Sequence, residues 1–481
     1  MKRRTFNRLR SAIEILTMVV VDTLVLIAIF RLALLIRTDV LPLLYPNFPA
    51  DEPFRKITNL AWVLLIWVFF LYYEDLYTRR FSLWDEIEAI VKVCFLSTIA
   101  TFTIISIGKL SEEISRTLIV VMGVLAVVLL PMGRTLSKAI LRRTGLLKRN
   151  VLILGATDSG RLIAKALSKE PNFGYVVIGF IDDDPSKIGT CIDNIKVHRG
   201  IDRAPSYVRR SNVTELFVAL PTEDRERVRG LINTLQHKVE RVLFVPDIIG
   251  VAVLGTSLVH FFQEQVVAFE IKNNLAKPFN TVLKRCFDLL FSFILLILLF
   301  LPMLATAMLI RADSKGRAIF RQRRVGQRGV LFDCYKFRTM YDDAEERLNQ
   351  ILREDGEARE EFQRYWKLRN DPRVTRVGRF LRKTSLDELP QLLNVLKGEM
   401  SIVGARPYIP EELPMLGNSH QTILLTRPGI TGLWQVSGRS DSDYGLRIAL
   451  DSWYVQNWNL WLDIVILFKT LAVVAKRQGA Y

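Results

Sequence analysis

The chain has 481 residues, half of them hydrophobic, with a formal net charge of +17 and a pI near 9.8. This length predicts two or three domains, and the high hydrophobic fraction predicts membrane segments. A basic excess suits nucleic acid, an anionic membrane surface or phosphorylated substrates. Because several apolar runs are present, we expect membrane lipids and phosphates as partners and no nucleic acid.

Cysteine and histidine usage excludes several kinds of site. The four cysteines and four histidines are scattered and show no metal-ligand or redox spacing. We therefore expect reduced, structural thiols and neither a zinc site nor a histidine-based triad.

Four apolar runs, near residues 13–36, 58–75, 88–107 and 117–137, are each about long enough to cross a bilayer. The first resembles a signal peptide, but its length and the lack of a cleavage pattern favour a retained anchor. Basic residues gather in the loops on one side of these spans, which the positive-inside rule makes cytoplasmic. Within the first span, Asp22 and Arg31 are predicted to pack inside the bundle or reach the interface, with a polar pathway as the alternative.

From Asn150 onward, short apolar runs alternate with helical stretches. This alternation predicts a parallel sheet with crossover helices, a Rossmann-like module. Its first turn, GATDSG from Gly155, lacks the middle glycine of the dinucleotide fingerprint and places Asp158 where a pyrophosphate would lie. Asp182 has the spacing of a ribose contact. A structural or regulatory module is favoured, with nucleotide binding as the alternative.

A fifth apolar run covers residues 286–310, with basic residues before and after it and Pro302 inside it. A spanning helix would carry one basic cluster across the membrane, whereas a proline kink would let the chain enter and return. We predict a re-entrant helical hairpin kinked at Pro302. The alternative, an ordinary fifth span, would place residues 311–481 outside the cell.

Two later segments have simpler interpretations. Residues 343–367 are charged on all sides and predict a solvated helix without chemistry. Residues 451–477 mix tryptophans, aliphatic residues and lysines, which predicts helices in the membrane interface, with packed core helices almost equally favoured.

The segment TSLDELP carries two adjacent carboxylates, Asp387 and Glu388. Ser385 and Glu388 have capping-box spacing, which predicts a helix that begins at Ser385 with both acids in its first turn. The same position favours a bound phosphate. Capping alone would explain the spacing, so the basic residues around the segment decide for a site.

Four motifs in the last 170 residues combine arginine or lysine with glycine, as phosphate sites do: FRQRRVGQRG, YKFRTM, RKTSLDELPQLLNVLKGEMSIVGARP and RPGITGLWQVSGR. Together, over residues 276–481, they resemble the monotopic polyprenyl-phosphate hexose-1-phosphate transferases, the bacterial sugar transferase family. The preceding spans and α/β module resemble its long form. One departure is GARP from Gly404, where the family commonly has GPRP, and Arg406 is retained.

The resemblance implies a covalent exchange. Asp387 would take a hexose-1-phosphate from a UDP-sugar, Glu388 would bind Mg²⁺, and undecaprenyl phosphate would accept the sugar phosphate, giving undecaprenyl-diphosphate-sugar and UMP. This would be the first membrane step of O-antigen, capsule or exopolysaccharide synthesis, with galactose expected and glucose as the alternative. The resemblance also implies that the substrate phosphates are bound by Lys336, Arg338, Arg379, Arg382, Arg406, Arg427 and Arg439.

The physical chemistry agrees with these implied roles. A carboxylate that attacks a diphosphate meets charge repulsion, which a metal ion and arginines would neutralise. Adjacent residues on a helix point in different directions, so one carboxylate could attack while the other holds the metal.

Two other classes of function stay open. One is a scaffold or regulatory protein of a polysaccharide assembly with a degenerate enzyme domain. The other is an NAD-dependent nucleotide-sugar dehydratase or epimerase, which predicts a Tyr-x-x-x-Lys pair that the region from Asn150 to Lys277 lacks.

We therefore expect a membrane protein of mixed class in the bacterial inner membrane. A four-helix transmembrane bundle would cover residues 1–145, a Rossmann-like α/β module 146–275, and a mainly α-helical catalytic domain 276–481, with the hairpin at 283–311. The N-terminus, module and catalytic domain are expected in the cytoplasm, and the surfaces of the bundle and module suit a homodimer.

Overall fold

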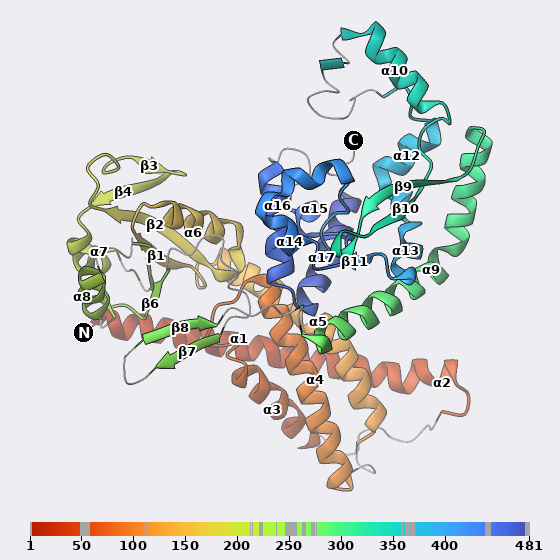
Figure 1. Cartoon of the computed structure of the whole chain (residues 1–481). Helices are drawn as coiled ribbons and strands as arrows, with labels where there is room; N and C mark the ends of the chain where they lie inside the picture. The colour runs from red at the N-terminus through yellow and green to blue at the C-terminus, as the bar shows by residue number, and fades with distance from the viewer. Residues whose placement is uncertain are drawn as a thin grey trace. The chain divides into compact units, whose positions relative to one another are not determined.

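The computed structural model describes residues 2–48, 58–110, 114–211, 213, 215–220, 225–236, 238–245, 257–261, 266–270, 275, 277–356, 359–360, 371–437 and 444–476. The chain forms two compact units, Met1–Ile249 and Gly250–Tyr481 (Figure 1). The first unit holds both the helical bundle and the α/β module.

The bundle consists of long apolar helices. Helix α1 (Lys2–Leu35) continues through a π-helical turn, Ile36–Val40, into α2 (Leu41–Leu44), and the others are α3 (Thr58–Tyr73), α4 (Leu83–Ile107) and α5 (Arg116–Arg143). The stretches Arg10–Leu44, Leu83–Ile107 and Arg116–Arg143 are long and apolar enough to cross a membrane. Helix α3 is apolar but has 16 residues, fewer than the roughly 20 a span needs. Within the described residues, three of the four predicted N-terminal spans therefore reach membrane length.

A buried group of charges holds the bundle together. Asp22 of α1 is fully buried and lies 3.3 Å from the Arg134 guanidinium of α5. Arg134 also pairs with Glu86 of α4 at 3.2 Å, and Glu86 pairs with Lys138 at 2.6 Å. Two acids and two bases thus neutralise one another, as buried charges must. The prediction that Asp22 packs inside the bundle is confirmed.

The α/β module is built on a six-stranded sheet of order β3-β4-β2-β1-β5-β6. All pairs are parallel except β3–β4, which is antiparallel, and helices α6, α7 and α8 connect the strands. Strand and helix bounds are β1 (Arg149–Leu154), α6 (Asp158–Lys169), β2 (Tyr175–Asp182), β3 (Cys191–Ile192), β4 (Ile195–Arg199), α7 (Ala204–Arg210), β5 (Glu215–Val218), α8 (Arg225–Leu235) and β6 (Arg241–Phe244). The predicted parallel sheet with crossover helices is confirmed.

The first turn of this module is closed by its own side chains. Gly155 has φ +97°, and a Cβ there would lie 2.3 Å from the Ala219 carbonyl oxygen, so glycine is required. The Ala156 N–H donates to Asp182 Oδ2 at 2.7 Å, and Thr157 Oγ1 caps α6 by accepting from Gly160 N at 3.2 Å. Asp182, predicted at the spacing of a ribose contact, therefore holds the turn, which supports the structural reading of this module.

Polar contacts attach the module to the bundle within the first unit. The Glu14 carboxylate of α1 accepts from Arg149 Nη2 of β1 at 2.8 Å and from Arg80 Nη2 at 3.2 Å. Arg80 Nη1 also donates to the Phe173 carbonyl at 2.8 Å, and Asn172 Nδ2 donates to Glu86 Oε2 at 2.7 Å. Charged residues of α1, α4 and β1, together with Arg80 just before α4, thus join the two parts.

The second unit is mainly helical and has small sheets. After the β7–β8 hairpin (Ser257–Phe261, Val266–Glu270), its elements are α9 (Pro278–Asp313), β9 (Ile319–Val325), β10 (Leu331–Phe337), α10 (Ala344–Glu354), α12 (Arg376–Thr384), the 3₁₀ turn η7 (Leu386–Glu388), α13 (Gln391–Lys397), β11 (Ser401–Val403), η8 (Pro410–Ser419), α14 (His420–Ile423), β12 (Gly429–Thr431), α15 (Leu433–Val436), α16 (Tyr444–Gln456) and α17 (Leu460–Ala475).

Two predictions for this unit were tested in part. Helix α10 has no buried residue and carries an exposed Arg347–Asp343 pair, as expected of a solvated helix. Trp458, between α16 and α17, is 2% exposed and belongs to the main core, so the packed-core alternative is correct for this part of the tryptophan-rich segment.

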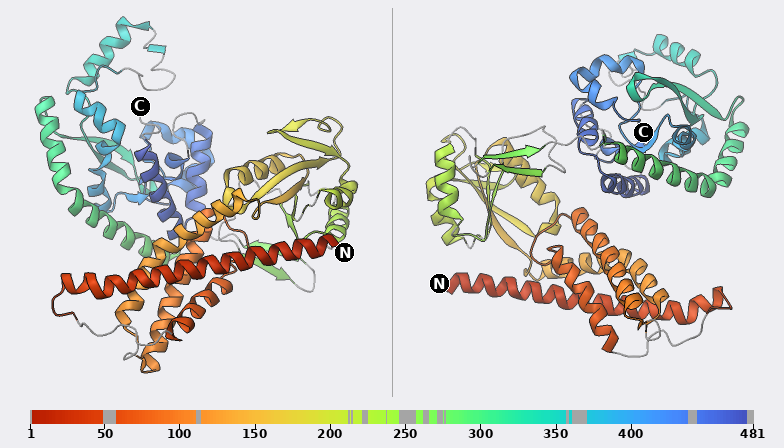
Figure 2. Two further views of the ribbon diagram at one scale, coloured as in Figure 1. Left: turned by 180° about the vertical axis from the view of Figure 1, so that it is seen from behind. Right: turned by 60° about the horizontal axis from the view of Figure 1, so that its bottom comes forward.

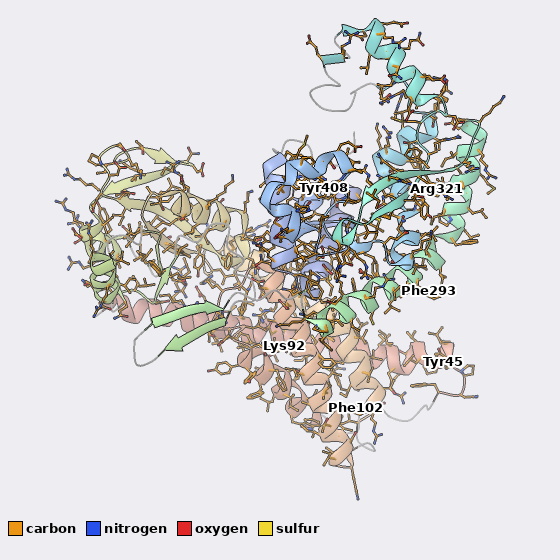
Figure 3. The ribbon with its side chains drawn as sticks, viewed as in Figure 1. Tyr45, Lys92, Phe102, Phe293, Arg321 and Tyr408 are labelled. Carbon is orange, nitrogen blue, oxygen red and sulfur yellow. The ribbon has the colours of Figure 1, made fainter. Side chains whose placement is uncertain are left out.

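Helix α9 differs from the predicted hairpin in one respect. It is a single helix of 36 residues with Pro302 inside it, rather than two helices separated by a break. Proline removes one backbone hydrogen bond but leaves the flanking turns intact, and Figures 1 and 2 show the helix bent instead of interrupted. Only 6% of the most apolar stretch of α9 is buried, and Phe293, labelled in Figure 3, is 58% exposed.

Both ends of α9 pack on the same domain. Near its start, Lys284 Nζ donates to Asp463 Oδ2 of α17 at 2.8 Å, and Asp288 Oδ1 accepts from Ser401 Oγ at 3.0 Å. Near its end, Ile310 packs in a cluster with Phe337 and Leu381. A straight helix of 36 residues would be about 54 Å long, so the bend lets both ends return to one domain.

Candidate active site

The β9–β10 hairpin forms one wall of the site. Its register places Lys336 opposite Phe320 and Cys334 opposite Gln322. Residues directly opposite one another share a face of the sheet, and Arg324, opposite Phe332, lies on that same face. Alternation along the two strands thus directs Arg324 and Lys336 to one side.

Helix α12 carries the chain to the two carboxylates. Thr375 caps its start by accepting from Gly378 N at 2.9 Å, and a Cβ at Gly378 would lie 2.0 Å from the Thr339 carbonyl oxygen. The glycine of RVGRFLRK therefore lets α12 lie against the chain that follows β10.

The predicted capping box at Ser385 is wrong. Ser385 ends α12 in the left-handed conformation (φ 54°, ψ 20°), and its side chain makes no capping hydrogen bond. Helix α12 runs on to Thr384, so Ser385 reverses the chain at a helix C-terminus instead of starting a helix. Asp387 and Glu388 lie on the 3₁₀ turn η7, before the seven-residue α13. The predicted helix that begins at Ser385, whose dipole would favour a phosphate there, is not observed.

The two carboxylates have different surroundings. Glu388 Oε1 accepts from Lys336 Nζ at 2.8 Å. Burial and the neighbouring Glu388 charge raise the pKa of Asp387 to about 6, while Lys336 and Arg382 act to lower that pKa. Arg382 donates from Nε to Thr339 Oγ1 at 2.9 Å. Glu388 is therefore stabilised as a carboxylate by an ion pair, whereas burial disfavours the ionised form of Asp387.

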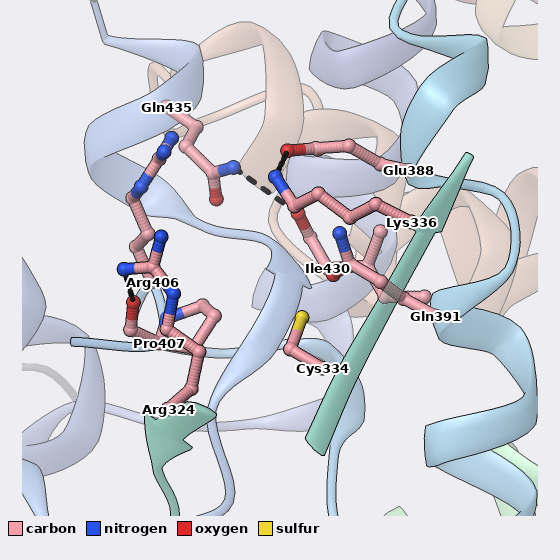
Figure 4. Close-up of a pocket in the computed structure, with 9 residues that line it drawn as sticks. All are labelled: Arg324, Cys334, Lys336, Glu388, Gln391, Arg406, Pro407, Ile430 and Gln435. Carbon is pink, nitrogen blue, oxygen red and sulfur yellow. Dashed lines mark hydrogen bonds and ion pairs between the residues drawn. The ribbon is translucent and has the colours of Figure 1, made fainter. Parts of the chain in front are cut away.

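A pocket adjoins Glu388 and Lys336 (Figure 4). Its lining includes three cationic side chains, Arg324, Lys336 and Arg406, and one acid, Glu388. Burial and then the neighbouring Arg406 lower the pKa of Arg324. Like charges this close favour a bound anion that neutralises them. The pocket is completed by Cys334, Gln391, Pro407, Ile430 and Gln435.

The glycine-rich motifs pack against one another. Strands β11 and β12 pair in parallel, with Ser401 opposite Gly429. A Cβ at Gly429 would lie 2.1 Å from Gly404 N, and one at Gly432 would lie 2.2 Å from Gly404 O. These glycines let the SIVGARP and RPGITG segments approach each other closely. This contact fixes the position of the chain that follows β11 and carries Arg406. This differs from the predicted cradle for phosphates.

The predicted phosphate-binding residues divide into groups. Lys336 and Arg406 line the pocket, and Arg382 lies close enough to Asp387 to affect its charge. The Arg338 guanidinium is buried and donates to the Lys315 and Ser314 carbonyls at 2.6 and 2.7 Å.

The remaining arginines lie elsewhere. Arg427 Nε donates to the Gly398 carbonyl at 2.8 Å, at the C-terminus of α13. Arg379 is exposed on α12, and Arg439 lies outside the described residues.

Sequence reasoning missed Arg324, Gln391 and Gln435. Arg324 belongs to the FRQRRVGQRG motif, and strand alternation in that motif, if applied, would have separated it from its exposed neighbours Arg321 and Arg323. Gln391 begins α13, and Gln435 lies within α15. The placement of these short helices depends on tertiary contacts, so no local signal identifies the two residues.

The residues present suit Mg²⁺ only together with a substrate. Among the described residues, no group of three or more His, Cys, Asp and Glu side chains could hold a metal ion. Magnesium commonly takes one or two carboxylates and completes its shell with substrate phosphates and water. Glu388 beside a cationic pocket fits this arrangement.

Comparison with known families agrees with this geometry. The model of the family described as "Bacterial sugar transferase" matches residues 279–477, which contain α9, the dyad and the pocket. A second model, described as "CoA-binding domain", matches residues 60–246, from α3 through the α/β module.

Relatives align over most of the chain. It is 40% identical over 405 residues to the undecaprenyl-phosphate galactose phosphotransferase of Salmonella typhimurium, covering 84% of each chain. It is 39% identical over 406 residues to the UDP-galactose-lipid carrier transferase of Erwinia amylovora, again covering 84% of each. Identity to the UDP-glucose:undecaprenyl-phosphate glucose-1-phosphate transferase of Klebsiella pneumoniae is 31% over 364 residues, 74% of each. The chain belongs to the bacterial sugar transferase family.

Proposed function

We propose that this protein transfers galactose-1-phosphate from UDP-galactose to undecaprenyl phosphate, giving undecaprenyl-diphosphate-galactose and UMP. The observation that carries the proposal is the Asp387–Glu388 pair beside a pocket lined by Arg324, Lys336 and Arg406. The two relatives at 39 and 40% identity are named for galactose and a lipid carrier, which supports this choice of substrates. The reaction would begin O-antigen or capsule synthesis at the inner membrane.

In the first step, an Asp387 carboxylate oxygen attacks the β-phosphorus of UDP-galactose. A bond forms between that oxygen and phosphorus, the bond to the bridging oxygen breaks, and UMP leaves with the electron pair. Arg324 and Arg406 offset the negative charge of the diphosphate as the carboxylate approaches. The raised pKa of Asp387 reflects a poorly solvated carboxylate, which is a better nucleophile than a fully hydrated one.

In the second step, a phosphate oxygen of undecaprenyl phosphate attacks the phosphorus bound to Asp387. The bond from phosphorus to the Asp387 oxygen breaks, and the carboxylate is restored. Lys336, which pairs with Glu388, keeps one positive charge beside both phosphoryl groups. Magnesium, if held by Glu388 and the substrate phosphates, would add charge neutralisation and alignment for in-line displacement.

Helix α9 would place this chemistry at the membrane surface. The apolar stretch of α9 is exposed. Both ends of the helix contact the same domain, through Lys284 and Asp288 near its start and Ile310 near its end. A bent helix of this kind dips into one leaflet and returns, so the site faces the cytoplasm where UDP-sugars occur. The lipid phosphate lies at the same level.

The proposal is tested with purified protein in lipid nanodiscs, undecaprenyl phosphate, Mg²⁺ and a panel of UDP-galactose, UDP-glucose and their N-acetylated analogues. We expect UMP release with UDP-galactose, abolished in Asp387→Asn. UMP release with UDP-glucose alone would favour the second candidate, glucose-1-phosphate transfer, which the Klebsiella relative supports at lower identity. Absence of UMP release with every donor would contradict the enzyme and favour a scaffold role.

A further inference from the structure

The loop between β11 and η8, residues 404–409, carries Arg406 and contacts helix α16. Asp451 of α16 is 1% exposed and accepts the Tyr408 hydroxyl at 2.7 Å. The backbone N–H of Arg406 lies close to the same carboxylate. Asp451 thus contacts two residues of the loop, and the Arg406 side chain lines the pocket.

One helical turn earlier, Arg447 holds the far end of the same loop. Its guanidinium lies 4.1 Å from the centre of the Tyr408 ring, and Nη1 donates to Glu412 Oε1 at 3.1 Å. Glu412 in turn accepts from Ile409 N at 3.0 Å. Residues 447 and 451 are four apart on α16, so both face the loop.

Strand β9 holds the loop from the other side. Arg324 Nη1 donates to the Pro407 carbonyl at 3.2 Å, and Val325 N donates to the Tyr408 carbonyl at 2.9 Å. Backbone and side-chain contacts therefore fix each of the three residues from Arg406 to Tyr408. Arg406 lies between buried neighbours and is the cationic residue that this loop contributes to the pocket.

We propose that Asp451 and Tyr408 are positioning residues that set the Arg406 guanidinium against the substrate diphosphate, with Arg447 bracing the same loop. The inference rests on the proposed function, because it assigns these residues to the binding of the UDP-sugar. Neither side chain lines the described pocket, so they act through Arg406. A correctly placed arginine gains its full electrostatic effect only when its geometry is held beforehand.

A double-mutant cycle tests the inference. Tyr408→Phe removes only the hydroxyl that reaches Asp451, and we expect kcat/KM for UDP-galactose to fall about five- to tenfold. In an Arg406→Gln background the same change should alter kcat/KM less than twofold, because the group it positions is gone. Affinity for UDP, measured by calorimetry on the same four proteins, should show the same non-additivity.

The matched control is Tyr175→Phe. The Tyr175 hydroxyl donates to Glu215 Oε2 at 2.5 Å within the α/β module, in the other compact unit. We expect a similar loss of thermal stability and an equal effect on kcat/KM in both Arg406 backgrounds. Equal effects of Tyr408→Phe in both backgrounds, in kcat/KM and in UDP affinity, would overturn the positioning role. An inactive wild-type protein would instead overturn the proposed function, and the positioning role would fall with it.

Discussion

At the scale of single residues, Asp387 and Glu388 owe their difference to neighbours and not to the motif. Glu388 is paired with Lys336 at 2.8 Å, whereas the pKa of Asp387 is raised to about 6 by burial and by the Glu388 charge. A nucleophile must be ionised to attack, so activity should fall as pH drops through about 6. The pH dependence of kcat/KM for UDP-galactose checks this expectation.

Lys336 should control the position of that acid limb. Its charge lowers the pKa of Asp387, so in Lys336→Met the limb should move to higher pH, together with a loss of activity from the missing cation. Lys383→Met removes the same charge from an exposed position of α12 and serves as the control. A limb that stays in place in Lys336→Met, or moves equally in Lys383→Met, would argue against this coupling.

The same raised pKa has a consequence for folding stability. The folded state holds the Asp387 proton more tightly than the unfolded chain, whose carboxyl has its ordinary pKa near 3.8. The charge at Asp387 therefore destabilises the fold above pH 6, and this penalty fades as pH falls from 6 towards 4. Asp387→Asn should raise the Tm at pH 8 by a few degrees and by less at pH 5. A Tm gain that is equal at both pH values would contradict this account.

Part of the site was predictable at this scale. The dyad and the pocket residues Lys336 and Arg406 follow from motif and resemblance. Arg338 and Arg427 were predicted to bind phosphates, but their guanidiniums donate to backbone carbonyls. An arginine in a motif looks the same in sequence whether it meets a phosphate or a helix end, because both offer oxygen acceptors. The prediction that a helix begins at Ser385 was wrong, because capping-box spacing does not reveal where the preceding helix stops.

At the scale of elements, the proposed position of the catalytic domain at the membrane depends on α9. Its apolarity and its basic flanks predicted a chain that enters the membrane and returns. The sequence did not reveal that the turn would be a bend within one helix, because a proline can either end a helix or kink it, and neighbouring contacts decide which occurs. Those contacts are Lys284 with Asp463 at one end and Ile310 with Phe337 and Leu381 at the other.

Cysteine labelling tests this topology. In a cysteine-free background, Lys277→Cys and Lys315→Cys, at the two ends of α9, should both resist a membrane-impermeant maleimide applied outside spheroplasts and react in inside-out vesicles. Asn47→Cys, which follows α2 on the opposite side of the predicted bundle, should react from outside. Labelling of Lys315→Cys from outside would establish α9 as an ordinary span and contradict the proposed location of the site.

At the scale of the whole molecule, the sequence predicted the kinds of parts better than their attachments. Membrane helices and a parallel α/β module follow from hydropathy and periodicity, whereas the mainly helical transferase domain follows from the resemblance of its motifs. The buried Asp22–Arg134–Glu86–Lys138 group and the Glu14–Arg149 pair join positions more than 45 residues apart. Sequence patterns do not reveal which of these distant charges pair, because each charged residue by itself is typical of the end of a span or of a loop.

The attachment of the α/β module to the bundle should depend on Glu14. Glu14→Gln removes the carboxylate that Arg149 and Arg80 share, while Arg149 keeps its pair with Glu240 at 2.8 Å. We therefore expect a cost below the about 3–5 kcal/mol of a buried pair that loses one partner. Limited proteolysis should then cut near Lys148 faster than in the parent protein. Glu345→Gln, on the exposed helix α10, should leave the cleavage rate unchanged. Equal rates in Glu14→Gln and the parent would show that other contacts suffice.

The covalent role of Asp387 is the central claim, and mass spectrometry of protein incubated with UDP-galactose and Mg²⁺, without undecaprenyl phosphate, tests it most directly. We expect one phosphogalactose adduct, located by peptide mapping on Asp387, with at most one UMP released per protein and loss of the adduct when undecaprenyl phosphate is added. No adduct in the parent protein, together with full turnover by Asp387→Asn, would contradict it.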